Sequence, residues 1–96
     1  MIKHVVCFKL KDNSEVVCEK TKDVLLSMKT NVKYVKDIEV GIDFLHSPRS
    51  YDIHLTVLLE NKEALDLYQD DPYHADVVKQ YMNGVSETSI TVDYEM

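Results

Sequence analysis

The chain has few cysteines, few basic residues and no long apolar run, and each shortage excludes a class of protein. Cys7 and Cys18 form neither a close metal-binding pair nor a disulfide framework, so we expect two buried thiols in a reducing cytoplasm. Lys3 and Lys9 interrupt the first apolar stretch, which predicts neither a signal peptide nor a membrane span. The net charge of −6 leaves no basic stripe that could neutralise the phosphates of a nucleic acid or an anionic membrane.

The length of 96 residues corresponds to a single domain, residues 1–96, with a small core. A domain of this size removes only about 60 to 65% of its unfolded surface from water on folding. No linker, internal repeat or low-complexity segment divides the sequence. Such limited burial predicts that a partner subunit contributes to stability.

Apolar residues recur with a period of two in four stretches and with a helical period between them. The expected strands cover residues 2–11, 37–43, 51–59 and 89–94, and the expected helices cover about 15–29 and 62–81, the second being restarted at Pro72. This order is typical of an α+β fold, the ferredoxin-like βαββαβ sandwich with a four-stranded antiparallel sheet. Right-handed crossovers place the first and third strands in the centre.

The two faces of the expected sheet differ in character. One face should lie under the helices and carry the apolar side chains Val6, Phe8, Leu55, Val57, Ile90 and Val92. The other is uncharged at its centre, with Val5, Cys7, His54, Thr56 and Leu58, and acidic at its rim, with Asp37, Glu39 and Asp93. An uncharged centre with a polar rim is the composition of a protein interface. We therefore expect a homodimer packed sheet against sheet through this second face.

The segment Asp71-Pro72-Tyr73-His74 opens a helix and aims a histidine from its first turn. Asp71 is a good N-cap, and Pro72 suits the first helical position because the amide it lacks would be unpaired there. The helical period then places on one stripe, facing the core, the residues His74, Val77, Val78 and Tyr81. Two interpretations follow for His74: a structural histidine paired with a carbonyl or carboxylate, or a general base that lines a pocket.

Short segments spread over the whole chain occur in the order found in a known family. They are Ile2-Lys3-His4-Val5-Val6, Lys9-Leu10-Lys11, Gly41 with Arg49-Ser50-Tyr51-Asp52, Ala64-Leu65 with Tyr68-Gln69, Pro72 with His74, and Val92-Asp93-Tyr94-Glu95. Through these segments the sequence resembles the stress-responsive A/B barrel domain, also called the Dabb domain. The resemblance implies a ferredoxin-like monomer that dimerises through its sheet into a closed α+β barrel. Fold alone assigns no chemistry.

One branch of that family, similar to plant polyketide cyclases of the olivetolic acid type, closes a ring by an intramolecular aldol reaction without metal or organic cofactor. By this resemblance His74 takes the position of the base, Tyr68 that of its partner, and His4 that of a pocket histidine. A further pocket histidine of the branch falls at Ile53, whereas His54 belongs to the opposite face of the strand and cannot replace it. The expected ligand-binding residues are His4, Phe8 and Ile53.

The charge of His74 is open from sequence alone. The start of a helix disfavours imidazolium and would keep the base neutral. The nearby carboxylates of Asp70 and Asp71 act in the opposite direction.

Two functions from different classes therefore remain. The first is a homodimeric domain of unassigned activity that binds a small hydrophobic ligand, and the second is a cofactor-independent polyketide-cyclase-like or isomerase-like enzyme with His74 as general base. A cofactor-free monooxygenase or haem-degrading enzyme ranks lowest, because the chain has no tryptophan to shape such a pocket. No metal is expected, because ligand spacing is missing among His4, His46, His54 and His74.

Overall fold

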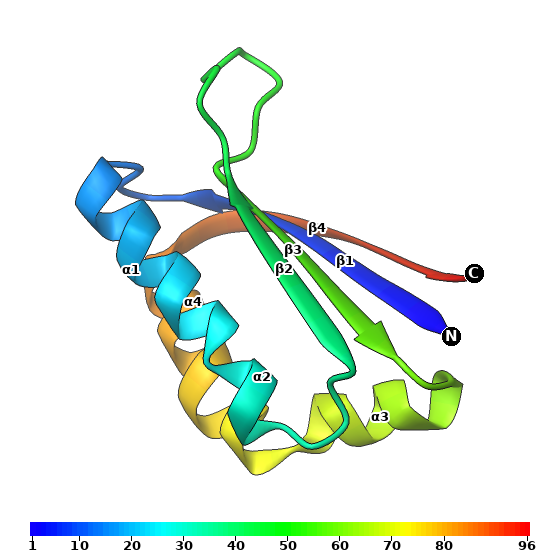
Figure 1. Ribbon diagram of the computed structural model, residues 1–96. Coiled ribbons are helices and arrows are strands. Elements are labelled where there is room, and N and C mark those ends of the chain that lie inside the picture. Colours follow the sequence, from blue (N-terminus) through cyan, green and yellow to red (C-terminus); the bar gives the residue numbers. More distant parts are fainter.

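Four strands form one antiparallel sheet, and the helices cover one side of it (Figure 1). A computed structural model describes all residues, 1–96. In chain order the elements are β1 (Ile2–Leu10), α1 (Glu15–Leu26), α2 (Met28–Asn31), β2 (Asp37–Ile42), β3 (Ile53–Leu59), α3 (Lys62–Asp70), the π-helix η1 (Tyr73–Val78), α4 (Lys79–Val85) and β4 (Ser86–Glu95). The predicted α+β ferredoxin-like fold is confirmed.

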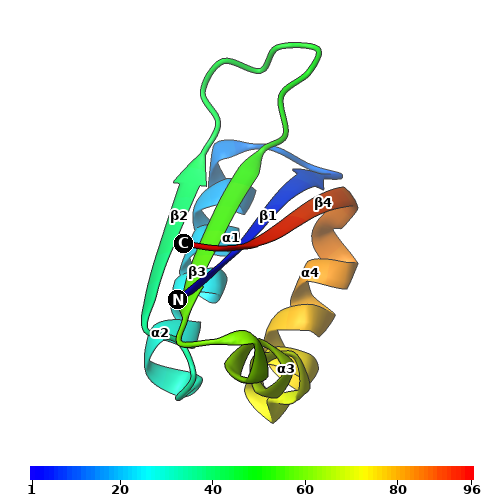
Figure 2. The same cartoon turned by 90° about the vertical axis from the view of Figure 1, so that its right-hand side faces the viewer.

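The sheet has the strand order β2-β3-β1-β4, so β1 and β3 lie in the centre as predicted. Val5 pairs with Thr56 of β3 on one side and with Val92 of β4 on the other. Figure 2, turned by 90° from Figure 1, shows the strands passing in front of α1, α3 lying below the sheet, and the connection between β2 and β3 projecting beyond the sheet. One face of the sheet is therefore free of helices.

Three element boundaries differ from the predicted ones. The first helix ends at Leu26, where the Ser27 hydroxyl donates to the carbonyl of Val24, and the short α2 follows. The third strand begins at Ile53, after Asp52, and β4 begins at Ser86, three residues before the predicted start.

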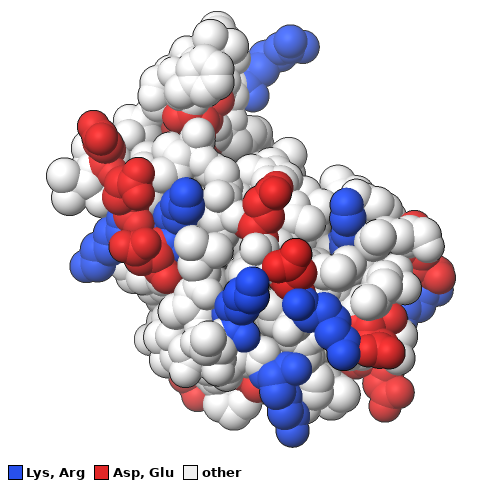
Figure 3. Space-filling view, in the orientation of Figure 1, with Lys and Arg blue, Asp and Glu red and all other residues white.

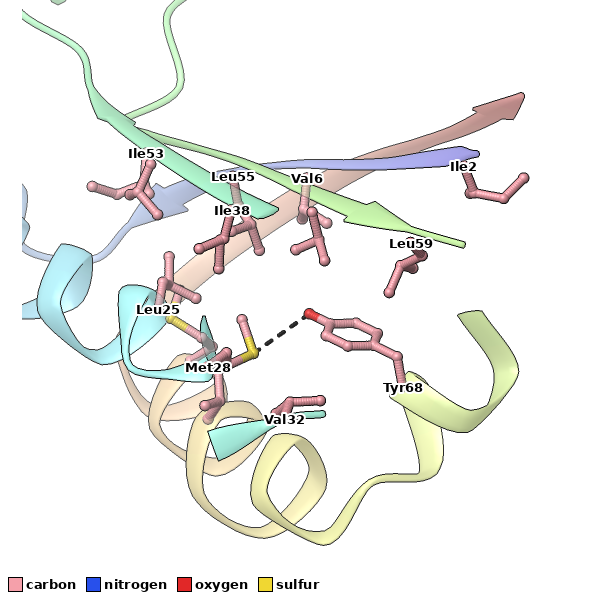
Figure 4. Close-up of a cluster of buried hydrophobic side chains, with 14 of the residues drawn as sticks. Ile2, Val6, Leu25, Met28, Val32, Ile38, Ile53, Leu55, Leu59 and Tyr68 are labelled. Carbon is pink, nitrogen blue, oxygen red and sulfur yellow. Dashed lines mark hydrogen bonds between the residues drawn. The ribbon is translucent and has the colours of Figure 1, made fainter. Parts of the chain in front are cut away.

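The core lies between the sheet and the helices (Figure 4). Val57 and Leu59 of β3 are fully covered, as are Leu25 of α1 and Met28 of α2. Tyr68 of α3 is also fully buried, with its ring between the helices and the central strands. Tyr68 is the largest of the fully buried side chains, and a buried aromatic ring contributes a large apolar area to a core.

The register of β4 overturns part of the predicted face assignment. Ile90 pairs with Cys7 and Val92 with Val5, so both lie on the face without helices, where they are 51% and 57% exposed. Asp93, expected at the rim of that face, instead pairs with His4 on the helix side. The prediction was wrong because alternating apolar residues in an edge strand do not by themselves show which face of the sheet they lie on. Here the apolar row is outward and the polar row inward.

The surface carries charges of both signs. On the face shown in Figure 3, acidic and basic side chains are interspersed. None of the helices combines the length and the apolar character that crossing a bilayer requires.

Asp52 fastens the end of β1 to the start of β3, and its removal is expected to destabilise the fold. Its buried carboxylate accepts hydrogen bonds from the Leu10 amide at 2.8 Å and from the Asn13 side chain at 3.2 Å. Asp52→Ala leaves a buried amide without its acceptor, which should lower the free energy of unfolding by about 2 to 3 kcal/mol in urea titrations. Asp52→Asn keeps one acceptor oxygen and should cost less. Equal stability of Asp52→Ala and the wild type would contradict this role.

Candidate functional site

A cavity of about 250 Å³ lies between the helix side of the sheet and the segment from α3 to α4. Its floor is apolar, and its wall includes imidazole and phenol rings. The lining residues are His4, Val6, Phe8, Leu25, Met28, Leu55, Tyr68, Gln69, His74, Val78, Lys79, Met82, Asn83, Ser89, Thr91 and Asp93. A concave, largely apolar space with a few convergent polar groups is the usual form of a ligand site.

Asp71 positions His74, in agreement with its predicted capping role. One oxygen of its carboxylate accepts from the amides of Tyr73 at 2.9 Å and His74 at 3.4 Å, and its backbone carbonyl accepts from Ala75 at 2.8 Å. Pro72 has helical backbone angles (φ −57°). The imidazole therefore emerges from the first turn of a capped helical segment.

That segment is a π-helix, η1, and its wider turn alters the predicted stripe. Val78 is buried, but Val77 is 47% exposed, so Val77 does not share the inward face of His74. A six-residue π-helix replaces the 3.6-residue period on which the prediction depended. π-Helical turns occur frequently at functional sites, because they redirect side chains that a regular helix would place elsewhere.

Three rings from three elements meet in the cavity wall. The ring of Tyr68 (α3) lies 4.5 Å from that of His74 (η1), centroid to centroid, with the planes tilted by 38°. On its other side it lies 5.6 Å from the ring of His4 (β1), edge to face at 64°. The structure thus brings together the three residues that the resemblance singled out.

Burial lowers the pKa of His74 below its ordinary value, and this is the largest influence on it. The hydrogen bond between its Nδ1 and the Gln69 carbonyl, at 3.3 Å, acts in the opposite direction. The charges of His4 and Lys79 lower the pKa further, and Asp71 raises it. The favoured form is neutral imidazole with Nδ1–H donating to Gln69, which leaves the lone pair on Nε2 to accept a proton.

Tyr68 is held as a neutral phenol. Burial raises its pKa far above the ordinary value, and its hydroxyl donates to the Met28 sulfur at 3.5 Å (Figure 4). A thioether is a weak acceptor, so a ligand oxygen would be a stronger partner for this O–H. Because its hydroxyl is bonded to Met28, Tyr68 contacts His74 through its ring and not through its hydroxyl.

Asp93 is a site residue that sequence reasoning assigned to the wrong face. Its carboxylate accepts from Nδ1 of His4, which fixes the orientation of that ring. Both residues occupy paired positions of β4 and β1. Directly paired residues of neighbouring strands lie on the same face, so pairing with His4 would have placed Asp93 on the helix side. That pairing is known only once the strand register is known.

The remaining predicted site residues separate into two groups. Phe8 lines the cavity, whereas Ile53 is part of the closed core and does not line it. The residues expected at a dimer interface are partly exposed on the opposite side of the sheet: Val5, Cys7, His54, Thr56 and Leu58. No group of three or more His, Cys, Asp or Glu side chains has a geometry that could hold a metal ion.

A four-stranded antiparallel sheet with one bare face, and a cavity under its helices, defines the class of small ferredoxin-like α+β domains. Within that class, residues 2–96 match the sequence profile described as the stress-responsive A/B barrel domain, Dabb. The chain belongs to this family, as the sequence resemblance indicated. No curated protein matches the chain.

Three solved structures illustrate the relationship. A dimeric ferredoxin-like protein of unknown function from Bacteroides fragilis is 26% identical, with a TM-score of 0.81 over 99% of this chain and 95% of that one. A protein of Arabidopsis thaliana is 21% identical, with a TM-score of 0.87 over 100% and 95%. A hydroxynitrile lyase from Passiflora edulis is 13% identical, with a TM-score of 0.76 over 99% and 92%. The last two show the shared fold alone.

The lowered pKa of His74 makes stability depend on pH in a defined direction. Because the folded-state pKa lies below the ordinary value of about 6.5, the unfolded chain binds the proton more readily. The free energy of unfolding should therefore decrease as the pH falls through 6.5 toward the folded-state pKa. Urea titrations at pH 7.5 and 5.5 should show a smaller decrease for His74→Gln than for the wild type. Identical decreases in the free energy of unfolding for His74→Gln and the wild type would contradict the lowered pKa of His74.

Proposed function

We propose that this protein is a homodimer in which each subunit binds a small hydrophobic ligand in the cavity beside His4, Tyr68 and His74. The observation that carries the proposal is the ring cluster itself. Two imidazoles and a phenol, each with a polar atom that a ligand could engage, meet at one wall of a space whose floor is apolar.

The uncovered face of the sheet supports the dimer. It carries the expected interface residues and also the exposed apolar side chains Ile90 and Val92 of β4. A groove of about 570 Å³ runs over the same face and is lined in part by Leu58 and Tyr94. Contiguous exposed apolar surface of this kind is typical of association sites, and the relative from Bacteroides fragilis is dimeric.

Leu58→Arg should separate the subunits. The substitution places a charge on the central strand β3, within the proposed interface, where it would be desolvated without a partner. We expect a monomer, or a chain too unstable to fold, by light scattering and circular dichroism. Asp23→Arg, on the exposed side of α1, is the matched control and should stay dimeric. An intact, stable Leu58→Arg dimer would remove this interface assignment.

The size and lining of the cavity set limits on the ligand. At about 250 Å³ it is smaller than the roughly 300 to 1,000 Å³ of sites for drug-sized molecules, so the ligand is small. Val6, Phe8 and Met82 offer apolar contact to its body, and the ring cluster offers hydrogen bonds to its polar end. No metal or organic cofactor is part of the proposal. The two free cysteines support a reducing cytoplasm as the location.

The second candidate is a cofactor-independent cyclase-like or isomerase-like enzyme with His74 as general base, and a specific observation favours it. Neutral imidazole held at Nδ1 by the Gln69 carbonyl presents Nε2 as the proton acceptor, and the Tyr68 hydroxyl lies on the adjoining ring. A phenol that stays protonated can donate to an enolate oxygen as charge develops there. The Passiflora edulis protein is a lyase with the same fold, so this scaffold is compatible with catalysis.

Proton abstraction can be measured without knowing the natural substrate. Ethyl acetoacetate is a small β-dicarbonyl probe whose C2 protons exchange with D₂O through an enolate, and NMR follows both its binding and the exchange. A positioned general base typically contributes about 10² to 10⁴ in rate. We expect the protein to accelerate exchange and His74→Ala to reduce the rate by at least about 10².

His46→Ala, in the loop between β2 and β3, is the matched control and should retain the wild-type rate. Binding without accelerated exchange would leave ligand binding as the function and eliminate the enzyme. Exchange that survives in His74→Ala would assign the base to another group.

A further inference from the structure

The mouth of the cavity is formed by four polar side chains that have no partner within the protein. Lys79 and Asn83 project from α4, one helical turn apart, and Ser89 and Thr91 project from β4 opposite them. None of the four side chains takes part in a side-chain hydrogen bond or an ion pair of the structure, whereas many other polar side chains do. All four residues are exposed, so their polar groups are accessible to a ligand at the mouth.

The charge at this mouth is uneven. Lys79 is the one lysine or arginine in the lining, and Asp93 is the one carboxylate. Asp93 is already engaged by Nδ1 of His4, on the inner wall. The ammonium group of Lys79 therefore forms no ion pair within the protein, in a chain whose net charge is −6, whereas three other lysines, Lys29, Lys36 and Lys62, do form ion pairs.

From this arrangement we propose that the ligand is a small monoanion, a carboxylate or comparable oxyanion on a compact apolar body, whose charged group binds Lys79 and Asn83 at the mouth. The proposal deepens the proposed function and rests on it, since it requires that the cavity be a ligand site. Lys79 supplies the charge, Asn83 an amide N–H₂, and Ser89 and Thr91 supply hydroxyl donors across the opening. The apolar part of the ligand then lies on the floor, against Val6 and Met82.

The orientation has a chemical consequence at the ring cluster. With its anionic group held at the mouth, the ligand directs its opposite end toward His74 and Tyr68. A neutral His74 does not compete with Lys79 for the anion, and the positive charge of Lys79 helps to keep His74 neutral. Lys79 would thus select the ligand and its orientation, while His74 and Tyr68 contact the end of the ligand opposite its anionic group.

The test compares cinnamate with its neutral analogue cinnamamide, which have nearly the same shape. Dissociation constants come from NMR titrations that follow the ring signals of His74 and Tyr68. We expect the wild type to prefer cinnamate and Lys79→Gln to bind cinnamate about two- to fivefold more weakly, the effect of losing one partly exposed ion pair. Cinnamamide should bind both proteins equally. Raising the salt concentration should weaken cinnamate binding to the wild type alone.

Two further variants keep the result specific. Lys79→Arg retains the charge and should retain the preference, whereas Lys22→Gln on α1 removes a charge that does not line the cavity and should change nothing. If both probes shift the ring signals but bind equally well to the wild type and Lys79→Gln, the anion site is wrong and the ligand cavity stands. If neither probe shifts those signals, the cavity as a ligand site fails and the inference fails with it.

Discussion

The pairing of β4 with β1 is the constraint on which both surfaces of this domain depend. In the observed register Val92 lies opposite Val5 and Asp93 opposite His4. The first pair adds apolar surface to the bare face of the sheet, and the second supplies the carboxylate that orients a cavity histidine. A shift by one residue would exchange the two rows and expose Asp93 on the face that is otherwise uncharged at its centre. The edge strand therefore links the bare face of the sheet and the cavity wall through a single set of backbone hydrogen bonds.

Tyr68 is the second element on which the site depends, and it combines two roles. As a fully buried aromatic ring it fills the space between α3 and the central strands. Its two ring neighbours come from different elements, His4 from β1 and His74 from η1. A side chain that packs the core and also touches both imidazoles keeps their separation constant, because the close packing of a protein interior resists small displacements.

The sequence was sufficient for the fold because its signals were local and agreed with one another. Alternation in β1 and β3, and the cap at Asp71, each predicted an element that the structure contains. The site was predictable only where a residue's position followed from such an element, as for His4 and His74. The inward position of Asp93 and the outward one of Ile90 depend on strand pairing, which a linear pattern does not contain.

The π-helix is a further limit on prediction from sequence. Periodicity of 3.6 residues placed Val77 inward together with His74, but the wider turns of η1 turn Val77 to solvent. The sequence pattern does not mark Lys79 and Asn83 for a related reason. A lysine and an asparagine on a helix are ordinary surface residues, and only the opposite strand makes them part of a cavity lining.

Successive side chains of a strand point to opposite faces of the sheet, and this limits which sequence changes the domain tolerates. Neighbouring residues of β1, such as His4 and Val5, belong to different surfaces: His4 to the cavity and Val5 to the bare face. Substitutions at alternate positions can therefore alter one surface while the other is preserved, so the cavity lining and the bare face of the sheet are free to change separately. Insertion or deletion of a single residue in β1 would exchange the surfaces and disturb both, so this strand tolerates replacement far better than a change of length.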